Sequence, residues 1–166
     1  MPVSTASITG IQYYNGNIYT LCRELDRNTK RRVIVFDGET YKEVNKWAVP
    51  GCYFVRNLAV VNDKVYVTDL YNNRLCVYSL TGSRVPMVQH STFVAPGFLN
   101  TCTQDSAIIS DRRGNKVYRL DTKEHKVIWT CALIKRPLSL CCDSKGDVWV
   151  WSETTNSIFL LSSESG

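Results

Sequence analysis

The sequence lacks several features that would place it in a special class of protein. Its uninterrupted apolar runs are only a few residues long, far short of the roughly 20 residues that cross a bilayer. The first seven residues have neither the basic start nor the apolar core of a signal peptide. No Asn-x-Ser/Thr glycosylation acceptor occurs either. We therefore expect a cytoplasmic protein with no membrane among its partners.

Paired cysteine motifs are also missing. The seven cysteines are an odd number without regular spacing, at positions 22, 52, 76, 102, 131, 141 and 142. None forms a Cys-x-x-Cys pair, and the neighbours Cys141 and Cys142 would point to opposite faces of a strand. We expect buried, reduced thiols rather than a disulfide framework or a zinc site, and no metal or other cofactor.

The strongest positive signal is an internal repeat of 41 to 42 residues. Its clearest copies are residues 65–79, 107–121 and 148–162. One asparagine slot is kept in all three: Asn73, Asn115 and Asn156. A fourth copy begins at Ile18 and resumes at Val33, because its loop is lengthened over residues 23–32. Each copy has two β-rich runs, called B and C, joined by a polar loop.

Further apolar runs precede and follow each copy, so the unit contains four antiparallel strands, A to D. No stretch has helical periodicity. A four-stranded unit of about 40 residues that cannot bury its own faces is typical of a β-propeller blade. The sequence predicts an all-β, propeller-like array of about four blades across residues 1–166, at roughly 8–49, 50–92, 93–133 and 134–166. A β-sandwich or a solenoid is the alternative.

Strand alternation predicts which side chains fill the seams between blades. We expect Val65 and Val67, and likewise Trp149 and Trp151, to pack against neighbouring blades. The repeated asparagines are expected in turns, because asparagine tolerates positive φ. Asp69 and Asp111 end strand B, where a carboxylate can accept backbone or arginine hydrogen bonds.

The copy at 65–79 resembles the NHL repeat found in the propellers of animal TRIM-NHL proteins. It reads VYVTD at 65–69, NNRL at 72–75 and VY at 77–78. The match is looser at 107–121, and the aspartate is replaced in the two other copies by Cys22 and Ser152. The resemblance implies a binding platform, a ring that closes with six blades, and a protein or RNA partner.

Groups that could form a catalytic site are few. There is no Gly-x-Ser-x-Gly elbow and no glycine loop that would cradle a phosphate. The two histidines, His90 and His125, are expected in a D-to-A connection and a C-to-D turn, on opposite faces. We therefore expect that the protein is not an enzyme.

Strand order places the B-to-C and D-to-A connections on one edge of the array, which we call the rim. Twelve of the 20 basic residues fall there, including Lys135 and Arg136, and a basic surface attracts anionic partners. Aromatic residues lie in or beside the same loops and could anchor a peptide or stack on a base. The candidate binding residues are Arg23, Arg27, Lys30, Arg31, Arg32, Tyr53, Arg56, Tyr71, Arg74, Phe98, Arg112, Arg113 and Lys116.

Two functions fit this rim. The first is a non-enzymatic platform that grips a protein partner, and the alternative is binding of single-stranded RNA. Four blades could close as a ring, could be completed by a second copy in a homodimer, or could be part of a longer propeller. The sequence favours the longer propeller, because an open arc would expose blade faces that soluble proteins cover.

Overall fold

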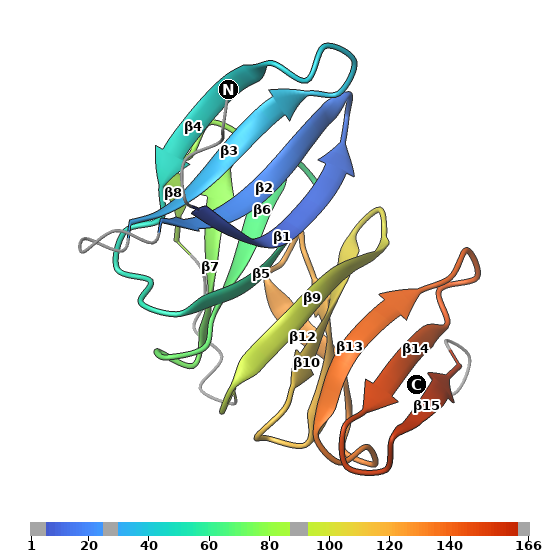
Figure 1. Ribbon diagram of the computed structural model, residues 1–166. Helices are drawn as coiled ribbons and strands as arrows, with labels where there is room; N and C mark the ends of the chain where they lie inside the picture. The colour runs from blue at the N-terminus through green and yellow to red at the C-terminus, as the bar shows by residue number, and fades with distance from the viewer. Residues whose placement is uncertain (1–5, 25–29, 87–92, 163–166) are drawn as a thin grey trace.

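The computed structural model describes residues 6–24, 30–86 and 93–162, and its strands form four antiparallel sheets in chain order (Figure 1). Among these residues no helix is long and apolar enough to cross a membrane. Two residues named above, Arg27 and His90, lie outside the described ranges. The predicted all-β array of about four blades is confirmed, and each sheet is one blade.

The strands follow one another from the inner edge of each blade to its outer edge. Blade 1 contains β1 (Ala6–Tyr14), β2 (Asn17–Glu24), β3 (Arg31–Asp37) and β4 (Glu43–Ala48). Blade 2 contains β5 (Val55–Val61), β6 (Lys64–Asp69), β7 (Arg74–Ser79) and β8 (Arg84–Val85). Blade 3 contains β9 (Pro96–Thr103), β10 (Ser106–Asp111), β11 (Lys116–Asp121) and β12 (Lys126–Cys131). Blade 4 contains β13 (Pro137–Cys142), β14 (Val148–Ser152) and β15 (Ser157–Leu161).

Three apolar clusters fill the seams between successive blades. Val65 and Val67 of blade 2 pack with Tyr19 and Leu21 of blade 1, and all four are buried. A second cluster joins blades 2 and 3, and a third joins blades 3 and 4. Because each fully buried aliphatic or aromatic side chain contributes about 1.5–3 kcal/mol, the seams supply most of the stability of the array.

The alternation of side chains along strand B of blade 4 (β14) explains why one prediction about the seams is wrong. In blade 4, Val148 and Val150 face blade 3 in the position that Val65 and Val67 occupy in blade 2. Trp149 and Trp151 therefore point the other way, and Trp149 is 41% exposed. The expectation that both tryptophans fill a seam is wrong, because their side of blade 4 has no described blade against it.

Inner strands of neighbouring blades also approach one another closely. A Cβ on Gly10 of β1 would lie 2.9 Å from the backbone nitrogen of Leu58 in β5, so only glycine fits there. The amide of Gln12 accepts a hydrogen bond from Val60 N (2.8 Å) and donates to Thr101 Oγ1 (2.8 Å). One side chain thus links the inner strands of blades 1, 2 and 3.

A disulfide between Cys102 of β9 and Cys142 of β13 joins the inner strands of blades 3 and 4. It corrects the expectation that all thiols are reduced. The two cysteines are separated by 40 residues, close to one repeat, and neighbouring blades place equivalent positions side by side. Cys22, Cys52, Cys76 and Cys131 are free and buried, and Cys141 is free and exposed.

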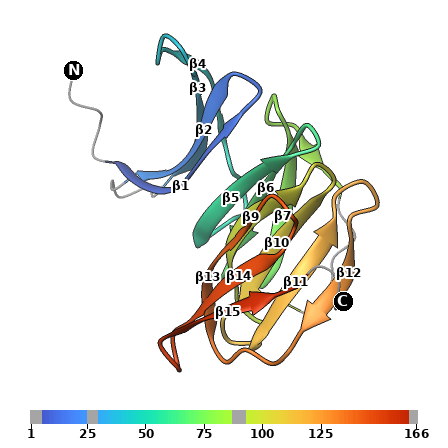
Figure 2. The ribbon, with the colours of Figure 1, turned by 90° about the vertical axis from the view of Figure 1, so that its right-hand side faces the viewer.

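The four blades form an arc, with blades 1 and 4 at its opposite ends (Figures 1 and 2). The end face of blade 1 exposes Ile11 and Tyr13, and that of blade 4 exposes Ile158 and Leu160. Whether a second copy or further blades cover these faces stays a prediction.

Replacing one isoleucine in a seam and one on an end face should have very different effects. Ile109 is fully buried between blades 2 and 3, whereas Ile158 is 69% exposed. We expect Ile109→Ala to lower the free energy of unfolding by about 2–5 kcal/mol. Ile158→Ala should change it by no more than about 0.5 kcal/mol. Urea denaturation measures both, and equal losses would contradict the arrangement of the seams.

Candidate functional site

The rim is held in shape by the residue that ends strand B. In blade 2 this residue is Asp69, which is fully buried. Its carboxylate accepts hydrogen bonds from Asn72 Nδ2 (2.5 Å), Arg74 Nε (3.3 Å) and Phe54 N (3.4 Å). Asn73 completes the loop with a φ of 52°, as predicted for a turn asparagine. One carboxylate thus joins loop 70–73 to connection 49–54 from the preceding blade.

In blades 3 and 4 the residue that ends strand B also fixes a connection, but through other hydrogen-bonding groups. Asp111 accepts hydrogen bonds from three backbone N–H groups, those of Val94 (2.7 Å), Ala95 (2.9 Å) and Gly114 (2.8 Å). In blade 4 the Ser152 hydroxyl donates to Lys135 O (2.7 Å). Asn115 and Asn156 have φ values of 53° and 50°. Both aspartates therefore have the structural role that the sequence predicted.

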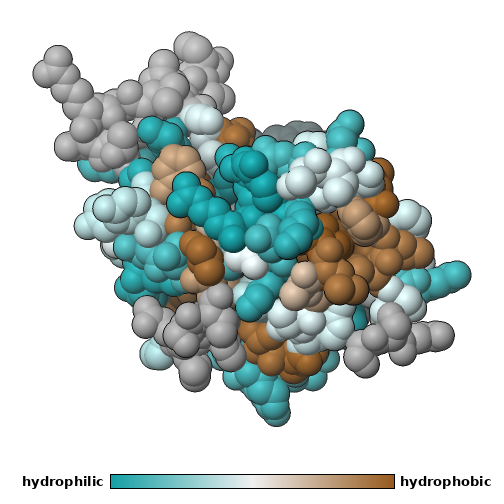
Figure 3. Space-filling model, turned by 90° about the horizontal axis from the view of Figure 1, so that it is seen from below, coloured by the Kyte–Doolittle hydropathy of each residue, from teal (hydrophilic) through white to brown (hydrophobic). Residues whose placement is uncertain are grey.

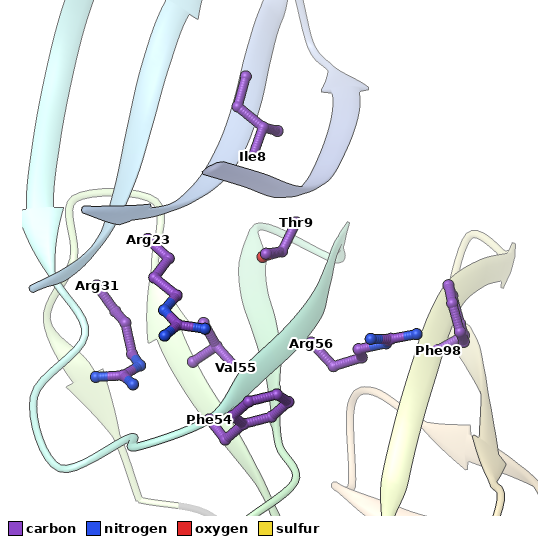
Figure 4. A pocket seen from close by; sticks show the side chains of 8 residues that line it. All are labelled: Ile8, Thr9, Arg23, Arg31, Phe54, Val55, Arg56 and Phe98. Atoms are coloured by element: carbon purple, nitrogen blue, oxygen red, sulfur yellow. The ribbon is translucent and has the colours of Figure 1, made fainter. Parts of the chain in front are cut away.

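Four of the candidate binding residues meet in one cavity of about 360 Å³ where blades 1, 2 and 3 converge. Its lining is basic and apolar: Ile8, Thr9, Arg23, Arg31, Phe54, Val55, Arg56 and Phe98 (Figure 4). We call it the arginine pocket. Figure 4 shows Arg23 and Arg31 on the blade 1 side and Arg56 extended toward Phe98. Among the residues that the structure describes, no acidic side chain lines this cavity.

Two arginines of the arginine pocket differ in their surroundings. The guanidinium of Arg56 lies 5.0 Å from the centre of the Phe98 ring, within the range of a cation–π interaction. The Nε of Arg23 is buried and has no hydrogen-bond partner in the part of the chain that the structure describes. An unsatisfied buried donor is costly, so an oxygen of a ligand would be favoured there.

An exposed aromatic pair lies beside Asp69. Tyr53 and Tyr71 are 62% and 73% exposed, and their ring centres are 5.7 Å apart in an edge contact. Arg74 pairs with Asp69 and also donates from Nη2 to the carbonyl of Gly51. Arg74 therefore supports the two loops that carry the tyrosines.

A second basic groove of about 470 Å³ crosses blades 3 and 4. It is lined by Arg112, Arg113, Asn115, Lys135, Arg136 and Thr154. Its charge is partly neutralised, because Arg112 donates to both carboxylate oxygens of Glu153 (2.7 Å each). Arg136 Nη2 lies 3.0 Å from the same carboxylate. The hydrogen bonds from Arg112, assisted by Arg136, lower the pKa of Glu153.

The remaining candidates are placed apart from these two cavities. Lys30 is exposed, Arg32 is half-buried in β3, and Lys116 begins β11. None of them lines the arginine pocket or the second groove. Seen from the rim side, hydrophilic residues run across the centre of the molecule with hydrophobic patches beside them (Figure 3).

Sequence reasoning missed the contribution of strand ends to the arginine pocket. Ile8 and Thr9 belong to β1, and Val55 begins β5. The rim residues were predicted from the loops of each repeat, whereas these three lie in or at the start of inner strands. The repeat alone carries no signal for them, because their role depends on how three inner strands converge.

No protein-family model matches the chain, and no curated protein is found to be similar in sequence. Solved structures do resemble it. Virginiamycin B lyase from Staphylococcus aureus has a TM-score of 0.76 at 19% identity, covering 99% of this chain and 55% of that one. U3-55K has a TM-score of 0.69 at 12% identity, covering 95% and 52%. BamB from Moraxella catarrhalis has a TM-score of 0.65 at 12% identity, covering 90% and 41%.

These likenesses show that the fold of this chain is a β-propeller, and that the chain spans about half the length of these proteins. They also correct one prediction. We expected that the protein is not an enzyme, and virginiamycin B lyase is an enzyme with this fold. The prediction relied on missing motifs, and a propeller can position catalytic groups from loops far apart in the sequence.

Loss of the Asp111 charge should loosen the rim. Asp111→Asn leaves one oxygen and an NH2 group facing three backbone donors, so we expect the free energy of unfolding to fall by about 2–4 kcal/mol. The matched control is Asp121→Asn, which alters a carboxylate that binds backbone N–H groups in an exposed turn and should cause a much smaller loss. Chemical denaturation compares the two, and equal stability of both variants would contradict the role of Asp111.

Proposed function

We propose that this chain is a protein-binding propeller of the NHL type, and that its rim holds a segment of the partner. The arginine pocket is the observation that carries this proposal. It combines three guanidinium groups with two aromatic rings and two aliphatic side chains in one cavity. Arginine and aromatic residues dominate the binding energy of protein interfaces, especially where they line a pocket.

The chemistry of the pocket indicates the kind of segment that it would bind. Arginine side chains remain charged at all physiological pH values and form paired hydrogen bonds with carboxylates. Phe54, Val55 and Phe98 offer apolar surface beside those charges. A partner segment with an acidic residue next to an apolar one would satisfy both parts of the cavity. The exposed pair Tyr53 and Tyr71 lies on the same rim and extends the available apolar surface.

The NHL assignment rests on residues whose roles agree with the repeat. Asp69 and Asp111 anchor the loops, and asparagines occupy the left-handed turn position in three blades. The propeller fold supports the assignment at the level of architecture.

Single-stranded RNA binding is the second candidate, and the second basic groove favours it. Arg113 and Lys135 line that groove and form no ion pair with any described residue, while Arg112 and Arg136 share one carboxylate. Arginine contacts to phosphate and stacking on exposed tyrosines are both used by RNA-binding proteins.

Reversal of one charge in the arginine pocket should weaken peptide binding. Peptides are selected on the immobilised chain from a random library, and their affinity is then measured by calorimetry. We expect acidic peptides with an apolar anchor, and a loss of at least about tenfold in affinity for Arg56→Glu, since loss of one partner of a charge pair that binding buries costs about 2 kcal/mol or more.

The matched control is Lys42→Glu, which makes the same charge change at an exposed position outside both rim cavities. It should leave peptide affinity within about twofold, because distant exposed charges are screened by salt. Selected peptides that bind both variants equally would show that the arginine pocket is not the site.

RNA binding is distinguished from peptide binding by its salt dependence. If the rim binds RNA, the affinity for a single-stranded oligonucleotide should fall linearly with log salt, with a slope of about −0.7 for each phosphate contacted. Arg113→Glu should reduce that slope, and Glu153→Gln should tighten binding by removing the acid of the second groove. Fluorescence anisotropy from low to moderate salt measures these effects, and a flat profile would exclude this second function.

A further inference from the structure

Two free cysteines meet beneath the rim of blade 2. Cys52 lies in connection 49–54 and Cys76 lies in β7, and their Sγ atoms are 3.0 Å apart. Both are almost completely buried, at 4% and 2% exposure. A carboxylate oxygen of Asp69 lies within 4.8 Å of both sulfurs. In the described part of the chain no other pair of free cysteines shows such a contact.

The position of the two sulfurs favours a covalent bond between them. A disulfide has its sulfurs about 2.05 Å apart, so they need to approach by only about 1 Å. Connection 49–54 is already fixed to loop 70–73 and to the start of β7, because the carbonyl of Gly51 accepts hydrogen bonds from Asn72 and Arg74. The backbone therefore holds both cysteines near the bonded geometry before any reaction occurs.

One of these cysteines borders a groove in the protein surface. Cys76 forms part of the wall of a groove of about 550 Å³, between Arg74 and Arg84. The S–H of Cys52 stabilises the Cys76 thiolate through a hydrogen bond, and together with Arg74 and Arg84 it lowers the pKa of Cys76 against the effects of burial and Asp69. The pKa of Cys52 is raised, because its proton is held in that hydrogen bond and burial disfavours its charge. Cys76 is thus the nucleophile. The hydroxyl of Tyr78 also lies near the pair, with its Oη 3.9 Å from Cys52 Sγ.

The same three groups are less suited to a metal ion. The carboxylate of Asp69 already accepts hydrogen bonds from Asn72, Arg74 and a backbone N–H. A cation bound to it would lie next to the guanidinium of Arg74. Structural zinc sites use four ligands, and only three are grouped here among the described residues.

We propose that Cys52 and Cys76 are a redox-active pair, which a hydroperoxide converts to a disulfide beneath the rim of blade 2. In the first step the Cys76 thiolate attacks an oxygen of hydrogen peroxide, the O–O bond breaks, and hydroxide leaves a sulfenic acid on Cys76. In the second step Cys52 sulfur attacks the sulfenic sulfur, and the S–S bond forms as the Cys52 proton leaves with the hydroxyl group as water. Two thiols are oxidised, one peroxide is reduced, and a thiol reductant reverses the change.

The disulfide would act on the rim itself. It ties connection 49–54 covalently to β7, and this connection carries Tyr53, which contacts Tyr71. Phe54 follows immediately and lines the arginine pocket. Oxidation would therefore add a covalent link to the hydrogen bonds that already hold the aromatic side of the rim, and reduction would leave those hydrogen bonds alone.

The test uses the full chain carrying Cys141→Ser, because that thiol is exposed and would react on its own. Four of the five free cysteines then remain. We expect millimolar hydrogen peroxide to lower the thiol count of the denatured chain from four to two and to lower its mass by about 2 Da, the loss of two hydrogens. Peptide mapping should find residues 52 and 76 cross-linked, and dithiothreitol should restore both thiols. The rate should rise with pH as the Cys76 thiol ionises, with a midpoint below that of an ordinary thiol, because the pKa of Cys76 is lowered.

Two variants separate this pair from general oxidation. In Cys52→Ser the reaction should stop at the sulfenic acid of Cys76, which dimedone traps, and no cross-link should form. In Cys131→Ser, which removes another buried free thiol, the cross-link should form as before. The proposal is overturned if peroxide leaves both thiols of the parent chain intact, or if the 52–76 cross-link is absent. It is also overturned if the isolated chain carries one equivalent of zinc that protects the two thiols.

Discussion

The hydrogen bonds of the polar side chain that ends strand B determine the shape of the rim. A D-to-A connection leaves one sheet and enters the next, so its backbone N–H and C=O groups have no strand to pair with. Asp69 and Asp111 accept hydrogen bonds from such N–H groups, and Ser152 donates to such a carbonyl. Because each of these residues is fully buried, the connections cannot shift without leaving polar groups unsatisfied. The loops of the rim are therefore positioned by the core of each blade.

This constraint explains why the proposed binding surface combines groups from several blades. The arginine pocket takes Arg23 and Arg31 from blade 1, Arg56 from blade 2 and Phe98 from blade 3. Their relative positions depend on the seams, on the close approach at Gly10 and on the bridge made by Gln12. A ligand in this pocket would contact three blades at once. Its binding would therefore stabilise the junction between them.

The rim of blade 2 also covers the thiol pair that we propose to be redox-active. The carboxylate of Asp69 accepts the hydrogen bonds that hold the loops, and it also lies close to the sulfurs of Cys52 and Cys76. The anchor of the loops and the thiol pair are therefore neighbours in one buried cluster. A covalent bond there would act on Tyr53 and Phe54 without changing the surface charge of the rim. The disulfide between Cys102 and Cys142, in contrast, joins two inner strands away from this cluster.

The repeat of 41 to 42 residues determined the fold class, the four sheets and the turn positions of Asn73, Asn115 and Asn156, because strand alternation and turn chemistry are local properties. It also identified the rim as the place where arginine and aromatic residues gather. The tertiary structure decided the rest. Only the structure shows which four of the candidates share a pocket and that Trp149 faces outward. It also shows that Cys102 and Cys142 form a disulfide. These outcomes depend on the angle and phase with which one blade packs on the next, and contacts between residues far apart in the chain set that packing.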